Sequence, residues 1–135
     1  MIINRETDYA LRILRELADG NNHSVVEICE KGQIPQAFAY KIIKKMQKKG
    51  FITVCRGAKG GCKMGRPFSQ ISLYDVICAV SLDSNISPCM DEGYDCIWRA
   101  ANGICAIHNN LAQIQAKLNQ ELKSYSVEQL VSAQL

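Results

Sequence analysis

The sequence predicts a mainly α-helical protein: a winged helix-turn-helix with a two-stranded wing, followed by a long C-terminal helix. Three patterns predict this class: short amphipathic segments near the N-terminus, a glycine-rich hairpin after them, and a narrow apolar stripe near the C-terminus. The chain has 135 residues, 47% of them hydrophobic, which fits one globular domain and excludes disordered and collagen-like classes. We expect one compact unit with two regions, residues 1–66 and 67–135.

The N-terminal region predicts three helices in close succession. Apolar side chains recur at helical spacing over residues 8–19 and indicate the first helix. Ser24 and Glu27 have the spacing of a capping box, which predicts a short helix over residues 25–31. A turn leads to a third helix over residues 35–49, whose proline suits its first turn. This order is that of a helix-turn-helix.

A β-hairpin is expected directly after the third helix. Residues 51–55 form a β-branched run, residues 56–61 are basic and rich in glycine, and residues 62–64 provide a short return strand. A hairpin in this position is a wing. Arg66 and Pro67 then break the chain, and we expect a linker there.

The C-terminal region predicts a fourth helix, an irregular segment and a long last helix. Residues 72–75 cap the fourth helix, which runs to about Leu82. Residues 83–103 are irregular apart from a turn near 96–101, and the long helix begins at about Ile104. Its narrow apolar seam has no partner left in so short a chain, which favours a homodimer. The seam consists of Ile107, Leu111, Ile114, Leu118 and Leu122.

The basic residues are unevenly distributed, and this points to DNA. Residues 1–66 carry a net charge of +7 and residues 67–135 one of −4, although the whole chain is only +3. A solvated lysine face is the simpler explanation of a basic helix, but the basic wing favours double-stranded DNA, read by a dimer as a pseudo-palindromic operator. RNA is disfavoured because no aromatic stacking platform is visible. The expected DNA contacts are Gln36, Ala37, Tyr40, Lys41 and Lys44, with Lys45 and Lys48 further along the polar side of the helix, and Arg56 and Lys59 in the wing.

The seven cysteines cannot all pair within one chain, because their number is odd. Cys29 and Cys78 lie inside predicted amphipathic helices, where we expect buried and inert thiols. Cys55 and Cys62 flank the wing tip and could face each other, although ordinary strand positions are favoured over a disulfide.

The other three cysteines form a different pattern. Cys89, Cys96 and Cys105 have the spacing Cys-x6-Cys-x8-Cys, and His108 follows three residues later. Soft thiolates in a loop-rich segment suit an iron–sulfur cluster or zinc, although structural zinc sites typically contain a Cys-x2-Cys pair that is missing here. The alternative is three thiols without a ligand.

Other classes of protein find little support. Charges precede any apolar run long enough for a secretory signal, and the longest uncharged stretch, residues 100–116, is too polar to span a bilayer, so we expect a cytoplasmic protein without a membrane partner. An enzyme is not expected, because the chain has two histidines and no recognisable catalytic motif. The tip over residues 57–61 lacks the Lys-Ser/Thr ending of a phosphate-binding loop.

Several motifs together resemble a known family. They are Thr-Asp-Tyr-Ala-Leu-Arg at 7–12, Val-Cys-Arg-Gly-Ala-Lys-Gly-Gly at 54–61, Ile-Ser-Leu-Tyr-Asp-Val-Ile at 71–77 and Ser-Val-Glu-Gln-Leu at 126–130, besides the three spaced cysteines. The chain resembles the IscR/NsrR/CymR-type winged-helix transcription regulators, the Rrf-two superfamily. It departs from their usual pattern at Cys62, where the wing is commonly aromatic, and at Tyr40 and Lys41 in the third helix.

The resemblance implies a homodimeric transcription regulator that carries an iron–sulfur cluster and senses redox state, nitric oxide, iron or cluster status. It implies that Cys89, Cys96 and Cys105 are ligands of the cluster. In the IscR-like pattern the fourth ligand is a histidine, matched by His108, and the cluster is [2Fe-2S]. In the NsrR-like pattern it is an acidic residue of the partner subunit, matched by Asp8, and the cluster is [4Fe-4S]. A clusterless thiol-based or small-ligand-responsive regulator on the same scaffold is the alternative.

Overall fold

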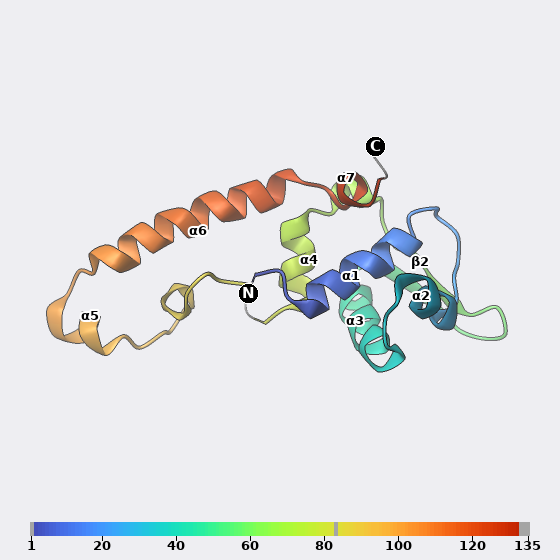
Figure 1. Cartoon of the computed structure of the whole chain (residues 1–135), viewed down its shortest axis with the longest axis horizontal. Helices are drawn as coiled ribbons and strands as arrows, with labels where there is room; N and C mark the ends of the chain where they lie inside the picture. The colour runs from blue at the N-terminus through green and yellow to red at the C-terminus, as the bar shows by residue number, and fades with distance from the viewer. Residues whose placement is uncertain (1, 83, 133–135) are drawn as a thin grey trace.

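A computed structural model describes residues 2–82 and 84–132. The predicted regions 1–66 and 67–135 lie within the described residues except at positions 1, 83 and 133–135. It is mainly helical with one two-stranded antiparallel sheet, as the sequence predicts (Figure 1). The elements are α1 (Arg5–Glu16), α2 (Val25–Gly32), α3 (Gln36–Lys48), β1 (Ile52–Cys55), β2 (Gly61–Met64), η1 (Phe68–Gln70), α4 (Leu73–Val80), η2 (Pro88–Met90), α5 (Ile97–Asn102), α6 (Ala106–Ser124) and α7 (Val127–Val131).

The helix ends follow from local hydrogen bonds. α1 begins about one turn earlier than predicted, because the side-chain oxygen of Asn4 accepts the Thr7 N–H at 3.0 Å and caps the helix there. Ser24 caps α2 as expected, with the Glu27 N–H donating to its hydroxyl at 3.1 Å. The Glu27 carboxylate binds Lys31 at 2.8 Å, so one half of the predicted capping box forms.

The turn between α2 and α3 depends on one unusual backbone conformation. Gln33 ends α2 in the left-handed region with φ 56°, and the next helix starts after Pro35, which serves as its N-cap. The three helices pack their apolar faces together. The apolar residues that recur at helical spacing in α3 face the core: Ala39, Ile42, Ile43 and Met46. Fully buried side chains in this bundle are Ala10, Ile13, Leu14, Leu17, Ile28, Ala39, Ile42 and Met46.

The wing is an antiparallel hairpin in which Val54 lies opposite Cys62 and Cys55 opposite Gly61. This register places Cys55 and Cys62 on opposite faces, so they do not face each other across the hairpin. All seven cysteines are free thiols. His23 extends the ladder, since its backbone exchanges hydrogen bonds of 2.8 and 2.7 Å with that of Cys62. A Cβ at Gly61 would collide with the His23 carbonyl, so this contact requires glycine.

The segment after the wing is packed rather than a free linker. Phe68 of η1 and Ile71 are buried in the same core as the helix-turn-helix. α4 follows, capped by the predicted box of Ser72 and Asp75, and it ends at Val80, two residues before the predicted end. Apolar side chains on both sides of the Arg66-Pro67 break thus complete one core.

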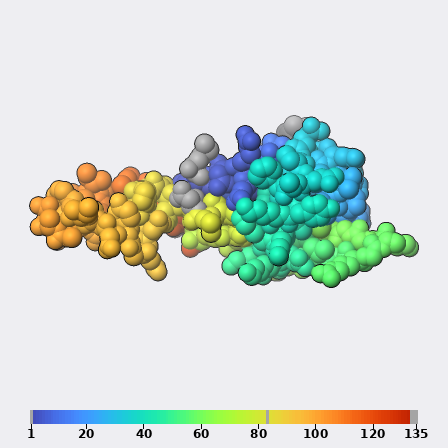
Figure 2. All heavy atoms as spheres, turned by 90° about the horizontal axis from the view of Figure 1, so that it is seen from below, coloured from blue at the N-terminus to red at the C-terminus, as the bar shows by residue number. Residues whose placement is uncertain are grey.

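The molecule has a compact part and an extended part (Figures 1 and 2). We call residues 2–82 and 126–132 the winged-helix head, and residues 84–125 the cysteine arm. The arm runs outward from α4 to α5 at its far end and returns along α6 to α7. Its two limbs are joined where the Ile86 N–H donates to the buried Gln115 side chain at 2.7 Å. None of the described helices combines the length and apolarity needed to cross a membrane.

Candidate DNA-binding surface and cysteine pocket

α3 presents a solvent-facing basic surface. All five DNA contacts predicted on this helix, from Gln36 to Lys44, are exposed, and Tyr40 is exposed by 56%. No acidic residue occurs in the first turn of α3. A helix that follows a tight turn and presents its N-terminal residues to solvent has the geometry for contacting base edges in a major groove.

An aromatic residue that the sequence analysis did not single out adjoins this surface. Phe38 is 44% exposed at the start of α3. Its ring lies 5.8 Å from that of Tyr9 in α1, measured between centroids, and Arg12 covers the Tyr9 ring. Helical periodicity could have identified Phe38, because it falls outside the inward face defined by Ala39 and Ile42.

Lys45 differs from its neighbours on α3. The sequence places it on the polar side with Lys44 and Lys48, but only 29% of its side chain is exposed. Its Nζ donates to the Val80 carbonyl at 2.9 Å and to Glu6 Oε2 at 3.2 Å. The ammonium group of Lys45 therefore binds within the head instead of facing solvent.

The wing tip carries the other predicted DNA contacts. Arg56 and Lys59 are both exposed at the projecting end of the hairpin, which is the green extension in Figure 2. Asn22 holds the tip in place by donating from its side chain to the Lys59 carbonyl at 3.0 Å. The wing is thus fixed to the loop between α1 and α2 and leaves its cations free for phosphates or a minor groove.

The arm contains a pocket of about 470 Å³ that brings together the four residues predicted as ligands. Cys89 lies in η2, Cys96 precedes α5, and Cys105 precedes α6 as its N-cap, so each thiol is placed by a different short element. Within the described residues, no three side chains of Cys, His, Asp or Glu converge closely enough to hold an ion. The thiols therefore share one pocket without meeting at one point. The lining residues are Cys89, Cys96, Trp98, Arg99, Cys105, Ala106, Ile107 and His108.

The polar atoms of this pocket are incompletely satisfied. Cys89 Sγ lies 3.2 Å from the Ser87 hydroxyl, and Cys105 Sγ accepts the His108 N–H at 3.4 Å. His108 Nδ1 is buried and has no hydrogen-bond partner. Burying an unpaired ring nitrogen is unfavourable, so this atom is suited to a metal or to a donor from outside the arm. Three thiols and one imidazole are a donor set that fits an iron–sulfur cluster.

The alternative fourth ligand, Asp8, lies in the head. Its carboxylate pairs with Arg12 Nη2 at 2.9 Å on the surface of α1. Arg12 Nη1 also donates to the Gly32 carbonyl at 3.3 Å. Asp8 does not line the pocket of its own chain.

The four other cysteines lie outside the pocket. Cys29 and Cys62 are buried, and burial raises the pKa of both thiols, which favours the unreactive protonated form. Cys55 is partly exposed in the wing. Cys78 is exposed, contrary to our expectation, because α4 turns Val76 and Ile77 to the core and leaves Cys78 on the outer side.

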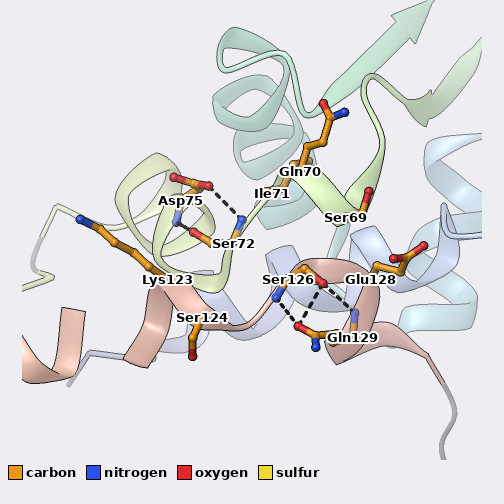
Figure 3. Close-up of a pocket in the computed structure, with 10 residues that line it drawn as sticks. All are labelled: Ser69, Gln70, Ile71, Ser72, Asp75, Lys123, Ser124, Ser126, Glu128 and Gln129. Carbon is orange, nitrogen blue, oxygen red and sulfur yellow. Dashed lines mark hydrogen bonds between the residues drawn. The ribbon is translucent and has the colours of Figure 1, made fainter. Parts of the chain in front are cut away.

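A second, polar pocket of about 520 Å³ lies where η1, α4, α6 and α7 meet (Figure 3). Two capping boxes fill its walls: Asp75 accepts the Ser72 N–H at 2.9 Å, and Gln129 accepts the Ser126 N–H at 2.8 Å. Lys123, also in the wall, covers the Tyr74 ring at 4.6 Å. Because the lining residues come both from the head and from the end of α6 in the arm, we interpret the pocket as the joint between the arm and the head.

Comparison with known proteins decides the family. A model of the Rrf2 family, described as iron-dependent transcriptional regulators, matches residues 3–133. The chain belongs to the Rrf2 family. Members of this family are transcriptional regulators and not enzymes, they bind DNA, and they typically act as dimers.

Individual proteins are similar to this chain in sequence or in fold. Protein aau3 of Rhizobium meliloti strain 1021 is 27% identical over 136 residues, covering 98% of this chain and 86% of that protein. The oxidised form of CymR from Staphylococcus aureus has a TM-score of 0.75 at 20% identity and covers all of this chain and 99% of its own. IscR of T. potens has a TM-score of 0.73 at 16% identity, with coverages of 100% and 94%. These structures share the fold.

Proposed function

We propose that this Rrf2-family regulator binds an operator as a homodimer and that an iron–sulfur cluster in the cysteine arm controls its affinity for DNA. The observation that carries the proposal is the arm pocket, where Cys89, Cys96 and Cys105 lie together with His108. The unpaired Nδ1 of His108 adds a second indication, because a ligand to this atom would remove an unfavourable burial. The family description as iron-dependent regulators supports the same chemistry.

Within this proposal, three thiolates and one further group would hold the cluster, and a bound cluster would supply a centre sensitive to redox state, nitric oxide or iron. We favour His108 as the fourth ligand, since it lines the pocket of the thiols while Asp8 is paired with Arg12. By the family resemblance, a histidine ligand implies a [2Fe-2S] centre, and Asp8 of the partner subunit would imply [4Fe-4S].

The dimer follows from the apolar seam of α6. α6 packs on α4, and Leu111, Leu118 and Leu122 of the seam are half-buried. Ile107 and Ile114 of the same seam are 72% and 53% exposed, which is unfavourable for large aliphatic side chains. A second copy would cover them and would bring two α3 helices to the two halves of a pseudo-palindromic operator. Gln115, which follows Ile114 on α6, accepts a hydrogen bond from the Ile86 N–H. The helix that carries the seam therefore also contacts the segment that leads to Cys89.

Spectra of protein purified without oxygen test the cluster. We expect visible absorbance and an EPR signal after reduction in the wild type. Cys89→Ser, Cys96→Ser and Cys105→Ser should each lose most of the absorbance, while the matched control Cys78→Ser retains it because that thiol lies outside the pocket. Wild-type protein that stays colourless after iron–sulfur reconstitution would contradict the proposal.

A clusterless thiol sensor on the same scaffold is the second candidate, because Cys89, Cys96 and Cys105 line one pocket. A similar structure, that of S. aureus CymR, is described in an oxidised form. In this case, oxidation would join or modify thiols of the arm pocket. Mass spectrometry before and after peroxide distinguishes the two candidates: a reversible disulfide in protein that never binds iron supports the thiol sensor.

A further inference from the structure

Lys45 connects three elements of the head at one point. Its Nζ binds the carbonyl of Val80, the last residue of α4, and the carboxylate of Glu6 in the first turn of α1. A cation at a helix C-terminus is favourable, because unpaired carbonyls gather there. Both contacts are charge-assisted hydrogen bonds, which are stronger than neutral ones.

The same point is the root of the cysteine arm. Ser81, which follows Val80 and is only 7% exposed, accepts a 3.0 Å hydrogen bond from the Asn4 side chain. Asn4 is also the N-cap of α1. The chain then leaves the head towards Cys89. We call Asn4, Glu6, Lys45, Val80 and Ser81 the Lys45 junction.

The neighbouring lysines of α3 provide a direct contrast. Lys41 is 64% exposed and lies 3.6 Å from Glu6, a longer and more solvated pair than that of Lys45. Lys44 and Lys48 are exposed. The ammonium group of Lys45 thus points into the head. There it joins α3 by a hydrogen bond to Val80, directly before the start of the cysteine arm.

We propose that Lys45 is a positioning residue: it sets the orientation of α3 relative to the root of the cysteine arm and does not contact DNA phosphates. A displacement of the arm's first residues would act on the Val80 carbonyl and, through Nζ, on a helix that reads DNA. The inference rests on the proposed function, because it names the contact by which the arm would influence the head.

Lys45→Met and Lys44→Met test the inference as a matched pair. Each removes one charge from α3, but only Lys45 binds Val80. The probe is a duplex selected from a randomised library by the wild-type protein, and affinities are measured by fluorescence anisotropy over a range of salt concentrations. Cluster-loaded and cluster-free forms of each protein are compared.

For Lys44→Met we expect equal weakening in both forms and a salt slope shallower by about one. For Lys45→Met we expect an unchanged salt slope, with the affinity ratio between the two forms reduced by at least about five-fold towards unity. Lys45→Arg, which keeps a charged donor, should restore much of the ratio. A shallower slope in Lys45→Met would identify Lys45 as a phosphate contact, and an unchanged ratio in folded protein would exclude the positioning role.

The experiment separates this inference from the proposed function. If wild-type protein binds equally in both forms, the cluster-controlled switch is wrong. Lys45 is then judged in cluster-free protein by its salt slope and by amide hydrogen exchange at residues 84–90, which should be faster in Lys45→Met than in Lys44→Met. If Lys45→Met fails to fold, Glu6→Gln replaces it, since this variant removes one of the two partners of Nζ and retains the other.

Discussion

The winged-helix head and the cysteine arm differ in how they obtain their structure. The hydrophobic core cluster lies wholly in the head, from Ala10 in α1 to Val127 in α7. In the arm, Gln115 is the one described residue that is buried. The arm instead exposes large apolar side chains, among them Ile97 by 88% and Ile104 by 84%. The head is therefore stabilised by its own core, whereas the arm depends on contacts from outside itself.

This contrast fits a division of tasks. A head with a buried core keeps α3 and the wing in a defined relation, which recognition of a duplex requires. An arm with few buried contacts can take two arrangements at low cost, which a switch requires. The following four predictions test the contrast, from the largest expected effect to the smallest.

A cavity in the core should separate the two regions most clearly. Ile42→Ala removes a fully buried side chain of the head and should lower the free energy of unfolding by about 2–5 kcal/mol. The matched variant Ile104→Ala removes the same atoms from an 84% exposed site and should change it by about 0.5 kcal/mol or less. Urea denaturation measures both values. Similar losses from the two variants would show that the arm has a core of its own.

A charge on the α6 seam should break the dimer without unfolding the head. Ile114→Asp places a carboxylate on the seam and should raise the dimer dissociation constant about 100-fold, equivalent to about 2.7 kcal/mol. Gln113→Asp, on the opposite side of the same helix, is the control and should leave the constant nearly unchanged. Analytical ultracentrifugation measures both. A dimer that tolerates Ile114→Asp would place the interface elsewhere.

A cation of the wing should matter for DNA, and one of the arm should not. Lys59→Ala removes an exposed charge at the wing tip and should weaken duplex binding several-fold, with a salt slope lower by about one. Lys117→Ala removes a charge that is also exposed, but on α6, and should leave the slope unchanged. Equal effects of the two variants would mean that binding responds to total charge rather than to the winged-helix surface.

The smallest effect concerns His23, whose backbone fixes the wing to the loop between α1 and α2. Its hydrogen bond to Asp19 raises the pKa of the imidazole above the ordinary value of 6.5, and Glu27 at 3.2 Å acts in the same direction. The stabilisation from this ion triad is therefore complete below pH 6.5 and is lost as the pH rises through the raised pKa of the folded protein.

His23→Gln tests this pH dependence. Because the carboxylates are partly exposed, the stability difference from wild type should reach about 1 kcal/mol at most, near pH 5.5 to 6, and decline towards pH 8.5. Thermal or urea unfolding at several pH values measures it. A difference that grows with pH would contradict the assigned direction of the pKa shift.

Local chemistry made much of the head predictable. The caps at Ser24 and Ser72, the inward face of α3 and the glycine-rich wing all appear in the sequence as short-range patterns. Short-range patterns do not predict tertiary contacts. The inward orientation of Lys45 and the burial of Phe68 in the common core depend on elements far along the chain.

The arm was predictable in composition but not in geometry. Spacing alone pointed to Cys89, Cys96 and Cys105, yet it could not show that three separate elements bring them to one pocket with His108. Spacing also could not show the exposure of Cys78. The sequence of α4, Leu-Tyr-Asp-Val-Ile-Cys-Ala-Val, is apolar on more than one face, so it does not indicate which face is buried. The proposed ligands and DNA contacts remain predictions.

The central claim is that the state of the arm pocket changes the affinity of the head for DNA. Its most direct test is the affinity of anaerobically purified protein for the selected duplex, measured with and without the cluster at one salt concentration. We predict a difference of at least about five-fold in the wild type and none in Cys89→Ser. Equal affinities of the two wild-type forms, or protein that never acquires a cluster, would contradict the account.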